Sequence, residues 1–195
     1  MRSRPARACK TRPCEMIARI FKELDSGAQV FAVLDGARDR RIRNWLLDTR
    51  APCWCLYRGE LPAALENAAP WLLRLVPGQP YVDDFLARGW GNAWGILLAT
   101  HVPSKDLRRH LRRFLRARTE EGRILAFRYY DPRVLRIYLP TCTREEIAAF
   151  FGPVGAFIAE AEEPGAAYVF RAAEAGLETR RIELPAAAAS ERIAS

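Results

Sequence analysis

Residues 127–135 read FRYYDPRVL, and this stretch decides how the middle of the chain is interpreted. Side chains alternate between two faces over residues 123–130, which predicts a strand. Because a proline follows Asp131, the aspartate is biased toward an extended conformation, and the strand should end there. A group of polar and aromatic side chains is therefore expected where the backbone leaves a sheet.

Two interpretations of this group remain open. Asp131 could accept hydrogen bonds from arginine and from turn amides in a structural polar cluster, and Asp35 could play the same structural part, because buried polar groups must be satisfied. Alternatively, Asp131 and Asp35, which also ends a predicted strand, could hold Mg²⁺ for phosphoryl chemistry, since carboxylate oxygens are ligands that Mg²⁺ prefers. A haloacid-dehalogenase-like site requires a second aspartate two residues after the first, but the residue at position 37 is alanine, which argues against such a site.

Helical and strand periods alternate along the chain and are followed by a late run of strands. This order predicts an α/β fold with a central mixed sheet flanked by helices and a short C-terminal strand-rich annex. Strands are expected over residues 30–34, 52–57, 70–76, 94–100, 123–130 and 134–139. Helices are expected from Met16 and over residues 39–49, 81–88, 104–118 (with Ser104 as the cap) and 144–151, the last opened by a Thr143–Glu146 capping box.

Four segments are expected from composition and pattern. They are a disordered basic tail (1–15), a core domain (16–154), the annex of the same domain (155–184) and a disordered alanine-rich tail (185–195). Met16 is an alternative start of translation. The chain has 195 residues, half of them apolar, which suffices for a sizeable core.

The formal charge of +8 is concentrated in two places. Residues 1–15 carry five basic residues and one acidic residue, and residues 104–118 carry seven basic residues and one acidic residue. The rest of the chain is slightly acidic. The arginine helix expected over 104–118, with Arg109 and Arg113 on its polar face, is therefore an electrostatic candidate for nucleic-acid binding, although no aromatic residues interleave for base stacking.

Several function classes find little support. No apolar run approaches the roughly 20 residues of a membrane helix, and no secretory signal is recognisable. The five cysteines are irregularly spaced, which indicates reduced thiols in a cytoplasmic protein and no zinc site. The two histidines lack a nucleophile motif around them, and the glycines of GWGNAWG (residues 89–95) precede a strand instead of a phosphate-binding helix. No catalytic residue, metal or cofactor is predicted.

The tryptophans of that same turn, Trp90 and Trp94, allow two interpretations. They either pack in the core or stand exposed as anchors for a protein partner, because large aromatic side chains dominate interface energetics.

Seven motifs then follow one another in a recognisable order: LDGARD, LYRG, APWLLRL, GWGNAWGILLATH, LRRHLRRFL, FRYYDPRVLRIYLP and AAFFGPV. In this order and spacing they resemble the Tap/Tec family of type VI secretion effector chaperones, also called adaptors. The resemblance covers residues 30–154.

The resemblance implies a cytoplasmic, non-catalytic protein of a Gram-negative bacterium. Such a protein would bind the N-terminal region or linker of one cognate toxin and help load it on the VgrG spike, with no role for a membrane or nucleic acid. We expect the partner surface to include Trp90, Trp94, Arg128, Tyr130 and Arg133, with Arg109 and Arg113 as the next surface.

Overall fold

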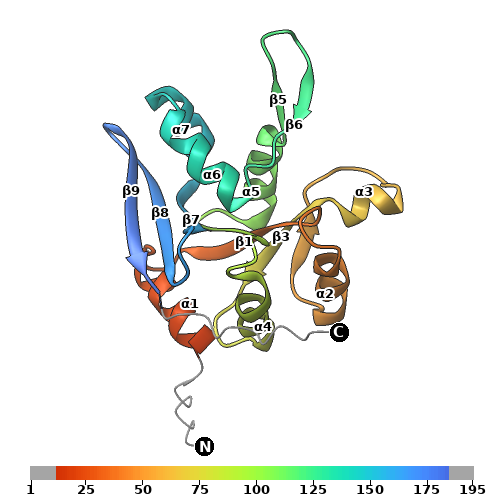
Figure 1. Ribbon diagram of the computed structural model, residues 1–195, viewed down its shortest axis with the longest axis vertical. Helices are drawn as coiled ribbons and strands as arrows, with labels where there is room; N and C mark the ends of the chain where they lie inside the picture. The colour runs from red at the N-terminus through yellow and green to blue at the C-terminus, as the bar shows by residue number, and fades with distance from the viewer. Residues whose placement is uncertain (1–11, 185–195) are drawn as a thin grey trace, which may run out of the picture.

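The computed structural model of the protein describes residues 12–184, and the predicted tails over 1–11 and 185–195 lie outside the described residues. A seven-stranded sheet forms the centre of the fold, in the order β2-β3-β1-β4-β7-β8-β9 (Figure 1). Its strands are β1 (Gln29–Asp35), β2 (Cys53–Cys55), β3 (Pro70–Leu75), β4 (Gly95–Thr100), β7 (Val154–Glu160), β8 (Ala166–Ala173) and β9 (Gly176–Glu183).

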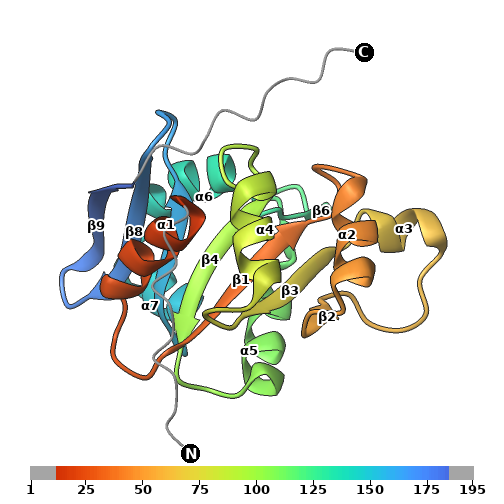
Figure 2. The ribbon, with the colours of Figure 1, turned by 90° about the horizontal axis from the view of Figure 1, so that it is seen from below.

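The faces of this sheet carry two separate hydrophobic cores. Along β1, Val30, Ala32 and Leu34 enter one core while Phe31 and Val33 enter the other, as the two-residue period of a strand requires. The first core is covered by α1 (Arg12–Lys22), α2 (Arg41–Thr49) and α4 (Pro80–Gly89), which lie over the sheet in Figure 2. The second is covered by α5 (Ser104–Leu111), α6 (Pro132–Tyr138) and α7 (Arg144–Phe151).

The predicted class, helices packed on a central sheet, is confirmed, with one difference in the sheet. Every strand pair among the described residues is antiparallel, so the sheet is not mixed. The strands predicted for the C-terminal annex belong to the same sheet, because β7 pairs with β4 and continues it through β8 to β9. Antiparallel pairing lets short connections join neighbouring strands, and β7 to β9 use it to extend the core.

The stretch around Asp131 differs most from expectation. The strand predicted over 123–130 shrinks to β6 (Ile124–Ala126), and the strand predicted over 134–139 is the helix α6 followed by the 3₁₀ turn η2 (Leu139–Thr141). The reason is local. Asp131 is an N-cap whose side chain accepts a hydrogen bond from the Arg133 N–H, and the proline occupies the first helical position, where its missing N–H costs nothing.

The arginine helix is shorter than predicted. Helix α5 begins after Pro103 as its N-cap, so Ser104 is the first helical residue instead of the cap. The helix ends at Leu111, continues as the 3₁₀ turn η1 (Arg112–Phe114) and then enters the strand β5 (Arg116–Arg118). The predicted helix over 104–118 is therefore wrong beyond Leu111, over about its last two turns.

The starts of two helices can be compared with their predicted positions. Helix α1 begins at Arg12, so the tail predicted to end at residue 15 is too long by one turn of helix. Helix α7 begins with the predicted capping box. The Glu146 N–H donates to the Thr143 hydroxyl at 3.2 Å, and the Thr143 N–H donates to the Glu146 carboxylate at 2.7 Å. The short helix α3 (Ala63–Asn67) completes the described elements. Within residues 12–184, no helix is long and apolar enough to cross a membrane.

Candidate functional site

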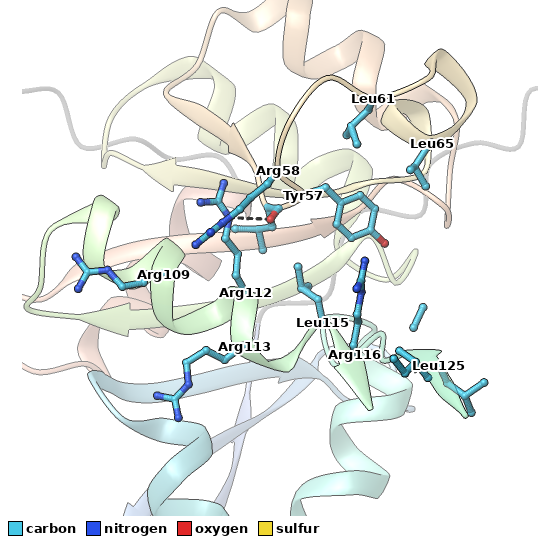
Figure 3. A pocket seen from close by; sticks show the side chains of 13 residues that line it. Tyr57, Arg58, Leu61, Leu65, Arg109, Arg112, Arg113, Leu115, Arg116 and Leu125 are labelled. Atoms are coloured by element: carbon cyan, nitrogen blue, oxygen red, sulfur yellow. Dashed lines mark hydrogen bonds between the residues drawn. The ribbon is translucent and has the colours of Figure 1, made fainter. Parts of the chain in front are cut away.

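A groove of about 820 Å³ lies between three segments that are far apart in the sequence (Figure 3). The loop from β2 to α3 forms one wall, the end of α5 with η1 forms the second, and the base of the β5–β6 hairpin forms the third. We call it the arginine groove, and it is lined by Leu56, Tyr57, Arg58, Leu61, Leu65, Arg109, Arg112, Arg113, Leu115, Arg116, Ile124, Leu125 and Ala126.

The charge of the arginine groove is entirely positive. Five arginines line it, and no aspartate or glutamate does. Arg109 is paired with Asp106 on its own helix, with an N–O distance of 2.6 Å. Among residues 12–184, no carboxylate forms an ion pair with the remaining four, which are Arg58, Arg112, Arg113 and Arg116. Their charges are left to solvent or to a partner.

Arg112 fixes two of the walls to each other. Its guanidinium donates from Nε to the Leu56 carbonyl oxygen at 2.8 Å and from Nη2 to the Cys55 carbonyl oxygen at 3.1 Å. Burial lowers the pKa of Arg112 below its ordinary value, and the neighbouring charges of Arg108 and Arg58 lower it further. These two hydrogen bonds join η1 to the end of β2 at the base of the groove.

Aliphatic side chains lie on the flank opposite α5 and η1, together with Arg58 and Arg116. In Figure 3 the labelled leucines Leu61, Leu65 and Leu125 lie to the right of Arg109 and Arg113. The structure describes five large hydrophobic side chains as exposed, and three of them line this groove: Ile124 (67%), Leu125 (50%) and Leu65 (45%). Clustered exposed apolar side chains mark interaction sites, whereas single ones are ordinary on protein surfaces.

The hairpin that carries two of these side chains projects from the body (Figure 1). Strands β5 and β6 pair only with each other, and all six of their residues are exposed. A hydrogen bond from the Phe127 N–H to the Leu115 carbonyl oxygen, 3.0 Å long, closes its base. Because an isolated two-stranded hairpin is marginal in water, this element has little stability of its own and room to adapt.

The carboxylates of Asp35 and Asp131 do not line the groove and are held by arginines. Asp35 is fully buried and accepts hydrogen bonds from the Ala37 N–H at 3.1 Å and from Nε of Arg128 at 3.0 Å. Burial raises the pKa of the Asp35 carboxyl above its ordinary value, although the Arg128 hydrogen bond opposes the shift. Asp131 accepts from Nε and Nη2 of Arg133 at 2.9 and 2.6 Å.

A magnesium ion at these carboxylates would have to displace both arginines. Within the described residues there is also no group of three or more histidine, cysteine or acidic side chains placed to hold a metal. The guanidinium groups of Arg128 and Arg133, which we expected to bind a partner, are used for these internal ion pairs, so any partner contact through them stays a prediction.

The three aromatic residues predicted as partner anchors belong to the cores. Trp90, Trp94 and Tyr130 are 8, 3 and 2% exposed. The Trp94 indole packs against Trp45 with ring centroids 5.9 Å apart, and its Nε1 donates to the Asp39 carboxylate at 3.2 Å. Of the two interpretations of Trp90 and Trp94, the structure therefore supports packing in the core, because helices α2 and α4 cover the turn before β4.

The comparison with family models identifies the chain. The model of a domain of unknown function, DUF4123, matches residues 30–149, more than half of the sequence. The chain belongs to the DUF4123 family. This is the type VI secretion adaptor (Tap/Tec) family of VgrG-associated proteins, so the resemblance seen in the sequence motifs is confirmed. No curated protein and no solved structure gives a significant match.

The DUF4123 match runs from β1 into α7 and contains every residue that lines the arginine groove. It stops before β7, so the last three strands of the sheet lie outside the matched region. The groove is therefore a feature of the DUF4123 part of the chain, whereas β8 and β9 extend the sheet beyond it.

Sequence reasoning found only the charged half of the groove. Arg109 and Arg113 were proposed as a second partner surface, and both line it. Tyr57, Leu65 and Leu125 were missed, because large apolar or aromatic residues in short apolar runs are normally assigned to the core. The apolar runs around these three residues are short, and this shortness was the signal that the segments bury little apolar surface.

Replacing Asp131 with alanine should lower the free energy of unfolding by about 1–3 kcal/mol, because an N-cap and a buried acceptor are both lost. Burial raises the pKa of the Asp131 carboxyl, but the Arg133 hydrogen bonds outweigh it and hold the pKa below its ordinary value. The carboxylate thus stabilises the fold above about pH 3.9, and the difference between variant and wild type should shrink as the pH falls below that value. Urea denaturation at several pH values measures this, and equal stability at pH 7 would contradict it.

Proposed function

We propose that this protein is an adaptor that binds one cognate type VI toxin, through the toxin's N-terminal region or linker, and helps load it on the VgrG spike. The observation that carries the proposal is the DUF4123 match over residues 30–149, because that family comprises VgrG-associated type VI secretion adaptors. We place this step in the bacterial cytoplasm, before the spike is fired.

The proposal includes no substrate turnover. The two carboxylates best placed for a metal-dependent enzyme, Asp35 and Asp131, are each engaged by an arginine. The arginine groove instead combines unpaired arginines with exposed aliphatic side chains, and arginine is enriched in the cores of protein interfaces. This combination supports a protein-binding role for the DUF4123 region.

The interface should exceed the groove itself. A standard protein interface buries about 1,600 Å² of surface in total and involves roughly 20–30 residues on each side, whereas 13 residues line the groove. We expect the toxin to contact the groove and the adjacent hairpin, with further contacts around them.

Co-expression with the type VI toxin encoded by the adjacent gene, followed by gel filtration, tests the adaptor function. The two proteins should co-elute, and a strain lacking this gene should fail to secrete that toxin while other type VI cargo leaves normally. Separate elution of the two folded proteins, together with normal toxin secretion in the deletion strain, would contradict the adaptor role.

A further inference from the structure

We propose that the arginine groove binds an acidic polypeptide segment that carries apolar side chains as well as carboxylates. The assignment of this segment to a type VI toxin rests on the proposed function, but the chemistry of the groove does not.

The charges of the groove call for an acidic occupant. Arg58, Arg113 and Arg116 form no ion pair within residues 12–184, and the lining contains no acidic side chain to answer them. Arginines gathered in this way repel one another, and a partner that supplies carboxylates relieves the repulsion and forms bidentate hydrogen bonds. Association should therefore be faster and tighter at low ionic strength.

The aliphatic flank calls for apolar side chains on the same segment. Leu65, Ile124 and Leu125 are 45–67% exposed, although each has an apolar side chain that burial would stabilise. They come from α3 and β6, and Arg58 and Arg116 lie on the same two walls, whereas Arg109 and Arg113 come from α5 and η1 (Figure 3). A segment that carries both carboxylates and apolar side chains matches this lining, and a purely acidic chain does not.

The scarcity of aromatic side chains in the lining disfavours a nucleic acid. Proteins that bind single strands stack bases on aromatic side chains along a basic groove, and Tyr57 is the one aromatic residue among the lining residues.

The adaptable hairpin fits a peptide ligand. Strands β5 and β6 leave both outer edges unpaired within the described residues, and the hairpin joins the body at the groove. Docking of a segment against Ile124 and Leu125 would bury the side chains that now make the hairpin marginal.

Selection of short random peptides displayed against the immobilised full-length protein tests the proposal without any toxin. The enriched sequences should combine Asp or Glu with Leu, Ile or Phe, and their binding should weaken as salt is raised to about 1 M, where the Debye length falls to about 3 Å. No enrichment, or enrichment of basic or uniformly polar peptides, would overturn the proposal.

Matched variants locate the binding. The double variant Arg113→Glu/Arg116→Glu should weaken the selected peptides by about tenfold or more, as should Leu65→Asp. Two controls should leave binding unchanged: Arg40→Glu/Arg144→Glu reverses exposed arginines outside the groove, and Leu47→Asp alters a leucine that is 56% exposed on α2. Circular dichroism melts check that each variant folds. Equal binding by the folded groove variants would overturn the assignment.

A single-stranded oligonucleotide serves as competitor. If it displaces the selected peptides from wild type at comparable concentration, the groove is a nucleic-acid surface and the proposal is wrong. The peptide selection and the co-elution experiment can fail independently. If acidic peptides are enriched but the toxin does not co-elute, the proposed groove chemistry stands and the adaptor role is wrong. If the toxin binds the groove variants as it binds wild type, the adaptor role stands and the groove is not its binding site.

Discussion

Replacing Gly95 with alanine should lower the free energy of unfolding by about 3 kcal/mol or more, a large part of the stability of an ordinary domain. Gly95 opens β4 and faces Leu34 on β1 across the ladder. A Cβ atom there would overlap the Val33 carbonyl oxygen and lie 2.9 Å from its carbonyl carbon and 3.0 Å from the Leu34 Cα. The obstructing atoms are backbone of a buried central strand, so a rotamer change cannot relieve the overlap.

The effect should reach beyond the strand pair. At the residue before Gly95, the Trp94 carbonyl oxygen accepts a hydrogen bond from the Asp35 N–H at 2.7 Å, and the Asp35 carboxylate accepts one from Arg128. Separating β1 from β4 would therefore disturb the buried carboxylate as well as the sheet.

Gly155→Ala is the matched control in β7, the other neighbour of β4. A Cβ at Gly155 would meet its nearest atoms at 3.6 and 3.8 Å, which is ordinary contact, so this variant should be neutral or more stable by about 0.4–1 kcal/mol. Urea denaturation of both variants gives the comparison. Similar stabilities of the two alanine variants would show that β4 can move away from β1 at little cost.

Local signals in the sequence were sufficient for most of the sheet and for several helix ends. The five-residue apolar run at 30–34 could only be a buried strand, and the Thr143–Glu146 capping box located the start of α7. The segment over 123–139 failed because two local signals competed there. Alternation favoured a strand, whereas Asp131 followed by proline is also a helix start, and only the packing of Leu135 and Leu139 in the second core decides between them.

The candidate site was harder to predict, because exposure is a tertiary property. Trp90 and Ile124 illustrate the difficulty. Trp90 stands between two glycines and Ile124 follows an arginine, yet helices cover Trp90 while Ile124 stands on a projecting hairpin and is 67% exposed. No local pattern distinguishes the two. The charge of Arg109 and Arg113 was visible in the sequence because it does not depend on packing.

Hydrogen exchange of the adaptor, alone and in complex with its co-expressed toxin, tests the central claim most directly. In the complex, amides of the β5–β6 hairpin and of residues 56–65 should exchange more slowly by about tenfold or more, since marginal elements gain most from a docked partner. Amides of α1 and β9, which do not line the groove, should be unchanged. Slowing confined to α1, α4 or β9, with the hairpin exchanging as fast as in the free protein, would contradict the account.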